Sequence, residues 1–192
     1  MRALVRKFDY WLCQWMGGFP FCSDPECLVK LQVTRAHHAM TVDGLEIKRG
    51  DPVLAIHLWN EHLPPLPGKE IDLAWAVKTQ RMFRSSLRKA AIYIKNTPPL
   101  MSLRAVMGVT SLFPPPEKPG EWHPMQRFGF TVIFYRSRLG RFGEFWENFY
   151  AWLLANAYNP ISLWRWGIFK RRRAEIWISM SSFLNRFGGE ST

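Results

Sequence analysis

Cysteine is scarce in this 192-residue sequence: Cys13, Cys22 and Cys27 are the only three, and none forms a C-x-x-C pair. A disulfide between two of them would require an oxidising compartment. Free thiols in a cytoplasmic protein are the favoured interpretation. Because paired cysteines are lacking, the sequence offers no thiolate site for a structural metal ion.

Long apolar runs are also lacking, since no run reaches the roughly 18 residues that a membrane-spanning helix requires. The first residues, MRALVRKFDYWLCQWMGGF, resemble a signal peptide only in part. Asp9 and Gln14 interrupt the apolar portion, and no small-residue cleavage site is evident. We therefore expect mature protein from the first residue, located in the cytoplasm.

The common catalytic and nucleotide-binding motifs are missing as well. There is no G-x-S-x-G elbow, no Walker loop and no G-x-G-x-x-G fingerprint, and no zinc finger or RRM signature is present. Glu144 and Glu147 are three residues apart, but a solvated helix edge explains them better than a general acid in a cleft. The sequence therefore leans towards a protein without catalysis, cofactor or metal.

Positive charge and aromatic side chains, by contrast, are plentiful. Lys and Arg number 26 against 15 acids, for a net charge of +11, and there are 10 Trp and 14 Phe. Such an excess favours polyanions, namely nucleic acid, anionic lipid or anionic glycan, or it only keeps the protein dispersed. Aromatic residues fill cores, and they also gather at membrane interfaces.

The alternation of apolar and polar residues predicts one α+β domain, with residues 1–27 as an N-terminal helix and loop and 28–192 as the main body. We expect a mixed or antiparallel sheet of about five to six strands with two long helices and an N-terminal helix. The expected strands are 29–34, 45–47, 53–59, 105–113, 130–135 and 174–179, and the expected helices are 1–16, 69–96, 123–128, 138–156, 161–169 and a terminal one that Ser179 or Ser181 caps and Gly188-Gly189 ends. The first three strands should form an antiparallel meander, and strand 130–135 should be buried on both faces.

The predicted central strand ends in a polar group that includes His57, Asn60, Glu61 and His62. His57 and Glu61 would share a strand face but lie too far apart for one metal ion, at roughly 3.3 Å per residue. The favoured interpretation is a buried His57 that is hydrogen-bonded to Asn60 or to backbone. The alternative is an enzyme or sugar-binding site centred on His57 and Asn60.

Two turns flank the same stretch, and each contains an aspartate. Asp43 precedes Gly44, and Asp51 follows Gly50, in pairs that favour tight turns. Both aspartates are turn residues first, and they are further candidates for ligand binding if the alternative site exists.

The predicted helix 138–156 is the richest in aromatic residues. Phe142, Phe145, Phe149 and Trp152 form one stripe; Trp164, Trp166 and the cations Lys170, Arg171, Arg172 and Arg173 follow. Aromatic residues beside Lys and Arg are typical of an element that lies on an anionic membrane. Packing against the sheet is the competing interpretation, and it explains one stripe well but the wider spread of aromatic residues less well.

A basic arc runs along the predicted helix 69–96. Arg81, Arg84 and Arg88 fall together at about 100° per residue. The arc is either a solvated face or a surface that contacts phosphate backbones without reading sequence. A nonspecific nucleic-acid binder is therefore a further alternative.

Three stretches of the sequence resemble one family. They are Asp43-Gly44, Ile47, Gly50-Asp51, His57-Leu58 and Asn60; Arg127-Phe128-Gly129-Phe130; and Glu175-Ile176-Trp177-Ile178-Ser179 with Leu184, Arg186, Phe187 and Gly188. In this order they resemble the YkoP-like domain family. The resemblance implies an accessory domain that occurs alone or attached to polysaccharide deacetylases, in the company of glycosyltransferases, and it implies no catalytic residues. We therefore expect a non-catalytic accessory protein of envelope polysaccharide or glycolipid metabolism, peripheral to the membrane, with an envelope-glycan enzyme or an anionic membrane surface as its partner.

Overall fold

A computed structural model describes residues 2–15, 17–65, 72–110, 123–135, 140–158 and 173–189 of the chain. The elements are α1 (Arg2–Trp15), β1 (Gly18–Phe19), β2 (Val29–Arg35), β3 (Met40–Val42), β4 (Leu45–Ile47), β5 (Pro52–Leu58), η1 (Asn60–His62), α2 (Leu73–Lys95), α3 (Pro98–Met101), β6 (Ala105–Thr110), η2 (Pro124–Phe128), β7 (Thr131–Phe134), α4 (Gly140–Tyr158), β8 (Ala174–Ser179) and α5 (Met180–Phe187). The predicted α+β class is confirmed. The predicted helix 161–169 lies outside the described residues.

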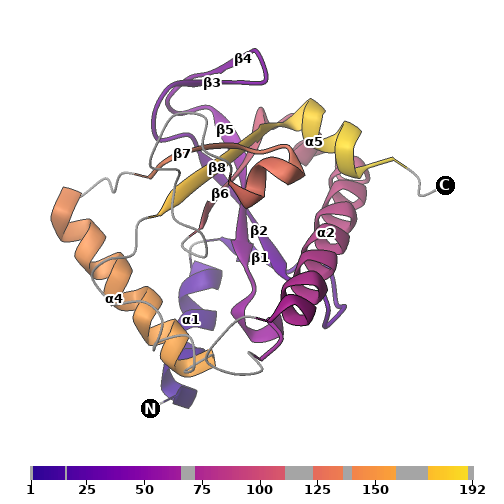
Figure 1. Ribbon diagram of the computed structural model, residues 1–192. Coiled ribbons are helices and arrows are strands. Elements are labelled where there is room, and N and C mark those ends of the chain that lie inside the picture. The colour runs from indigo at the N-terminus through magenta and orange to yellow at the C-terminus, as the bar shows by residue number, and fades with distance from the viewer. Residues whose placement is uncertain are drawn as a thin grey trace.

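A six-stranded sheet in the order β1-β2-β5-β6-β8-β7 forms the centre of the molecule (Figure 1). Strands β5 and β6 pair in parallel, and the other neighbouring strands pair antiparallel, so the sheet is mixed. The parallel pair requires a long crossover, and α2 with α3 supplies it.

The main core lies between one face of this sheet and α2 and α5. Leu54, Ile56 and Val106 of the sheet are buried against the stripe Leu87, Ala90, Ala91 and Ile94 of α2, and against Phe183 and Phe187 of α5. The stripe repeats at helical spacing, which is why α2 forms and docks on this face. Asp72 caps the start of α2 by accepting a hydrogen bond from the Trp75 amide at 2.6 Å.

A small hairpin, β3 with β4, covers part of the opposite face of the sheet. Val42 and Ile47 of the hairpin are buried against Val53, Ala55 and Trp177 of the large sheet. The hairpin turn is Asp43-Gly44, where both residues have positive φ, 51° and 77°. The predicted antiparallel meander is therefore wrong, because β2 pairs with β5 directly and β4 forms a separate two-stranded sheet with β3.

Strand β7 differs from the prediction as well. It lies at the edge of the sheet, pairs only with β8 among the described strands, and leaves Phe134 54% exposed. The expectation that strand 130–135 is buried on both faces is wrong. An apolar run is compatible with an edge strand, since apolar character does not determine the position of a strand in the sheet.

Helices α1 and α4 pack against each other, away from α2 (Figure 1). The rings of Phe8 and Tyr150 meet edge to face at 6.3 Å, and the Tyr150 hydroxyl donates a hydrogen bond to Asp9 Oδ1 at 2.6 Å. Helix α4 is held to the sheet region through Glu147, which accepts hydrogen bonds from Tyr135 and Arg173. We call these two packed helices the α1–α4 pair.

Candidate functional site

The predicted site residue His57 lies on β5, on the sheet face opposite the main core. Its Nε2 lies 2.6 Å from Gln32 Oε1. Since an amide oxygen only accepts, Nε2 carries the proton. The side chain is exposed and its partner is Gln32 of β2, so the expectation of a buried histidine bonded to Asn60 or backbone is wrong.

Three further side chains lie on this face near His57, namely Lys30, Gln32 and Trp59. We call these three residues and His57 the Lys30–His57 cluster. Lys30 is the direct cross-strand neighbour of His57. It is buried, with 8% of its surface exposed, and its Nζ lies 4.8 Å from the centre of the Trp59 ring. Partial burial and then the charge of Lys30 hold the pKa of His57 below its ordinary value.

The other predicted site residues are not brought to His57. Asp43 lies in the hairpin turn, where its Oδ2 accepts a hydrogen bond from the Ser179 amide at 2.9 Å. Asp51 precedes β5 at the strand end opposite His57, accepts from the Lys48 amide at 2.9 Å and pairs with Arg104 at 3.2 Å. Both aspartates thus stabilise turns. Asn60 begins η1, and its side chain lies outside the described residues.

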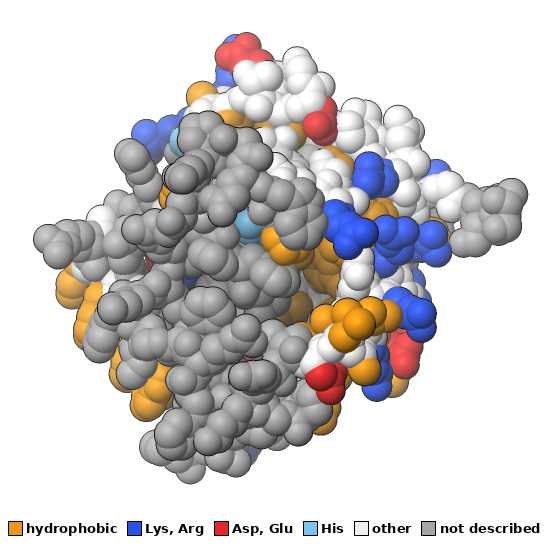
Figure 2. Space-filling view, in the orientation of Figure 1, with side chains coloured by type: hydrophobic (Ala, Val, Ile, Leu, Met, Phe, Trp, Pro, Cys, Tyr) orange, Lys and Arg blue, Asp and Glu red, His pale blue; other side chains and the backbone are white. Residues whose placement is uncertain are grey.

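Aromatic side chains of the α1–α4 pair are exposed to an unusual extent. We call this surface the aromatic face; it consists of Leu4, Phe8, Trp11 and Trp15 of α1 and Phe142, Phe145, Trp146 and Phe149 of α4. Trp15 is 74% exposed and Phe142 66%. Figure 2 shows hydrophobic side chains along the edge of the molecule where α4 lies. Soluble proteins rarely expose large apolar patches unless those patches bind something.

Contacts between rings run along each of the two helices of the aromatic face. On α1, Trp11 contacts Phe8 at 6.1 Å and stacks on Trp15 at 6.2 Å. On α4, Trp146 meets both Phe142 and Phe149 edge to face. The predicted residue Trp152 is half-buried and stacks on Phe149 at 6.0 Å.

Of the predicted cations after α4, only Arg173 lies within the described residues. Its guanidinium forms an ion pair with Glu147, donates to Asn148 at 3.2 Å and lies 6.0 Å from the Tyr135 ring. The side chain is 14% exposed, so Arg173 fastens α4 to the start of β8. Trp164, Trp166, Lys170, Arg171 and Arg172 lie outside the described residues.

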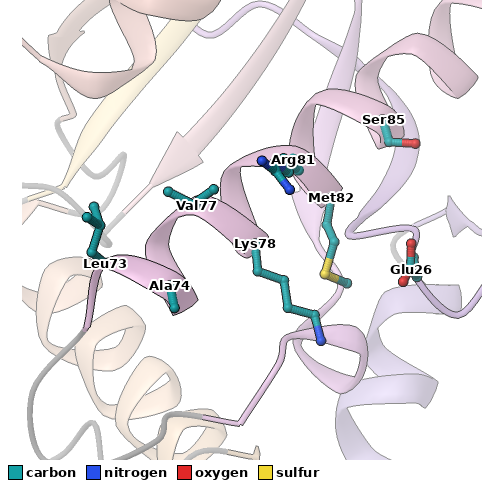
Figure 3. Close-up of a pocket in the computed structure, with 8 residues that line it drawn as sticks. All are labelled: Glu26, Leu73, Ala74, Val77, Lys78, Arg81, Met82 and Ser85. Atoms are coloured by element: carbon teal, nitrogen blue, oxygen red, sulfur yellow. The ribbon is translucent and has the colours of Figure 1, made fainter.

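The predicted basic arc of α2 is present, with Arg81, Arg84 and Arg88 all exposed. Arg84 lies 5.9 Å from the Phe128 ring. A shallow hollow beside the arc is lined by Leu73, Val77, Lys78, Arg81, Met82 and Glu26, among others (Figure 3). Glu26 offsets part of the positive charge of this hollow, and the hollow lies apart from the Lys30–His57 cluster.

Sequence reasoning missed two features of these sites. Lys30 alternates with Val29 and Leu31, which indicates a solvent-facing lysine, yet Lys30 is buried. The aromatic stripe of α1 repeats at helical spacing, but nothing in the sequence shows that its side chains stay exposed. Among the described residues, no three His, Cys, Asp or Glu side chains gather as a metal site, and no helix is long and apolar enough to cross a membrane.

Comparison with known proteins finds a match to a family model. A family model described as the YkoP domain matches residues 23–187, which include α4 and the Lys30–His57 cluster and leave out α1. No curated protein matches the chain. No solved structure matches it either.

Proposed function

The chain belongs to the YkoP domain family, and from the aromatic face we propose that it is a non-catalytic accessory protein that binds anionic membrane surfaces peripherally. In this role it would serve enzymes of envelope polysaccharide or glycolipid metabolism. One observation carries the proposal: two neighbouring helices expose stripes of Trp, Phe and Leu.

The aromatic face has the chemistry of an element that lies in the membrane interface. Trp11, Trp15 and Trp146 combine a large apolar surface with an indole N–H, and such side chains prefer the boundary between acyl chains and water. Each fully buried large apolar side chain contributes about 1.5–3 kcal/mol. Several such residues therefore support reversible binding without a membrane-spanning helix.

Cations near the aromatic face in the sequence provide the electrostatic part of the proposed binding. Lys7 is exposed on α1, and Lys170, Arg171 and Arg172 follow α4 in the sequence. Each cation near an anionic leaflet contributes about 1 kcal/mol. Arg173 does not add to this attraction, because its charge is paired with Glu147.

The envelope-glycan part of the proposal depends on the family. The resemblance to YkoP-like domains implies attachment to polysaccharide deacetylases or the company of glycosyltransferases. The proposed role follows from this implication. A peripheral protein with an exposed aromatic face would hold such an enzyme close to its lipid-linked substrate.

Vesicle co-flotation tests the proposal. The native chain should float with anionic vesicles at low salt, float less as salt rises, and float little with zwitterionic vesicles. Trp11→Gln with Trp15→Gln, and separately Phe142→Gln with Trp146→Gln, should each weaken flotation several-fold. Replacing Lys170, Arg171 and Arg172 by Gln, with Arg173 kept, should weaken flotation on anionic vesicles alone.

A matched control distinguishes binding through the aromatic face from nonspecific hydrophobic adsorption to vesicles. Leu73 and Ile92 are exposed apolar residues of α2, 79% and 55% exposed. Leu73→Gln with Ile92→Gln should leave flotation unchanged. If the native chain stays in the soluble fraction on anionic vesicles at low salt, the proposal is wrong.

A further inference from the structure

Lys30 is a buried cation without an acidic partner among the described residues. It lies near the start of β2 with 8% of its surface exposed, and no carboxylate of the described residues forms an ion pair with it. Its ammonium lies 4.8 Å from the centre of the Trp59 ring. Burying a charge costs free energy unless the charge is paired, so this position favours an anion from outside the chain.

A second hydrogen-bonding side chain lies directly beside Lys30. His57 is paired with Lys30 across β2 and β5, and neighbours in this relation have Cβ atoms about 5 Å apart. The exposed ring of His57 forms the side of the cluster that solvent reaches. Its Nε2 proton is directed to Gln32, so Nδ1 is left to accept a second proton. The Trp59 ring supplies an apolar surface beside the Lys30 ammonium.

Two carboxylates lie in the same region, and both have aromatic hydrogen-bond donors. Asp9 accepts from the Tyr150 hydroxyl at 2.6 Å, and Glu61 accepts from Trp59 Nε1 at 3.0 Å. Both are close enough to affect the thiol of Cys13, as is Lys30. Among the described residues, neither carboxylate forms an ion pair with the ammonium of Lys30.

We infer that the Lys30–His57 cluster binds an oxyanion of the phosphate class. The ammonium of Lys30 would donate charge-assisted hydrogen bonds to the anion, and His57, protonated at both nitrogens when the anion is bound, would donate a further one. A phosphate oxygen has the charge and the acceptor capacity for both donors. The anion is either free phosphate or the phosphate of a lipid headgroup. The inference does not depend on membrane docking through the aromatic face.

Calorimetric titration with two probes tests this inference. The probes are inorganic phosphate and dihexanoyl phosphatidic acid below its micellar concentration. Lys30→Met, which keeps the length of the side chain and removes the charge, should weaken binding at least about tenfold, because a hydrogen bond to a charged group is worth that factor or more. Lys48→Met removes an exposed lysine of a turn and should leave binding unchanged.

The two probes distinguish the source of the anion. Binding of both supports a site for phosphate itself, and binding of the lipid alone supports a headgroup site. Native protein that binds neither probe overturns the inference, as does Lys30→Met protein that binds like the native protein. If the site takes free phosphate, vesicle flotation of Lys30→Met should remain native; if it takes a lipid headgroup, flotation of this variant should weaken.

Thermal unfolding supplies a second measurement. Phosphate should raise the melting temperature of the native protein at constant ionic strength and leave that of Lys30→Met unchanged. If Lys30→Met does not fold, protection of Lys30 against reductive methylation by phosphate in the native protein measures the same contact. Methylation of Lys30 at the same rate with and without phosphate would overturn the inference.

Discussion

Two buried charged residues of the sheet have different environments. The Glu175 carboxylate accepts a hydrogen bond from Trp177 Nε1 at 2.9 Å and lies 3.6 Å from His38 Nε2. Lys30 has an aromatic ring and a neighbouring histidine instead. Buried charges persist where they are hydrogen-bonded or paired. The fold itself therefore satisfies Glu175, whereas Lys30 is the residue at which an external ligand would contribute most.

The stability of the protein should depend on pH through His57. Its pKa in the folded state is below the ordinary 6.5, so the unfolded chain takes up this proton first as the pH falls. Stability is therefore fully present above about pH 6.5 and declines below it. In His57→Gln this part of the decline should be absent.

Urea unfolding of native and His57→Gln protein between pH 7.5 and 5 measures the difference in slope. Asp24 has a lowered pKa because Lys89 and the Glu26 amide donate hydrogen bonds to it, so its contribution is lost only below 3.8, outside this window. Equal slopes for the two proteins would contradict the assignment to His57.

At the scale of single elements, β6 packs closely against both of its neighbouring strands at Gly108. Gly108 lies between Ile56 of β5 and Ile176 of β8, its register partners on either side. A Cβ at Gly108 would lie 3.0 Å from Ile56 Cγ1, 3.1 Å from Ile56 O and 3.3 Å from Ile176 Cγ1. Only glycine fits here without displacing a strand on one side.

Gly108→Ala should therefore destabilise the protein by about 1–3 kcal/mol, the cost of overpacking a filled core. The midpoint of urea unfolding should fall while the slope of the transition stays constant. Gly189→Ala is the matched control, because no atom lies within 4 Å of a Cβ at that position. A Gly108→Ala protein as stable as the native one would show that β5 and β8 can move apart at little cost.

Elements with local signals are the ones that the sequence predicts well. Strand β8 has the predicted bounds, and α5 begins after Ser179, whose hydroxyl accepts from the Ser182 amide, and ends at Gly188 as expected. Pairing partners are not local. Between β2 and β5 in the chain, β3 and β4 form a hairpin outside the large sheet. No residue of β4 indicates that β2 pairs with β5 and not with β4.

The candidate sites also divide into features that local sequence predicts and features that depend on tertiary packing. His57 was predicted as a site residue from its place at the end of a strand, and it is part of the cluster. Lys30 was not, because burial of a strand lysine depends on what covers that face. The separation of Asp43 and Asp51 from His57 depends on the hairpin, which carries Asp43 to the end of β8.

At the scale of the whole molecule, the aromatic face and the basic arc of α2 lie on different sides. Figure 1 shows α4 and α2 at opposite flanks of the sheet, with α1 below the sheet, and Figure 2 shows Lys and Arg gathered on the flank where α2 lies. Exposed charges farther apart than about 10 Å are largely screened at 0.1 M salt. The two surfaces should therefore act independently.

Replacing Arg81, Arg84 and Arg88 together by Gln tests this independence. The triple variant should elute from heparin at clearly lower salt than the native protein, because these exposed cations contact a polyanion without specificity. Its flotation with anionic vesicles should match that of the native protein. Equal losses in both assays would mean that the arc and the aromatic face form one polyanion-binding surface.

The position of β8 in the sheet has a consequence for biosynthesis. Strand β7 precedes β8 by about forty residues in the chain but, among the described strands, joins the sheet only through it, since β8 lies between β6 and β7. Synthesis proceeds from the N-terminal end at about 5–20 residues per second. The pairing of β1, β2, β5 and β6 can form on the ribosome, whereas β7 must wait until residues 174–179 have emerged. During this interval β6 has a free edge and β7 is unpaired, so a nascent chain stalled before β8 should be a preferred substrate for chaperones.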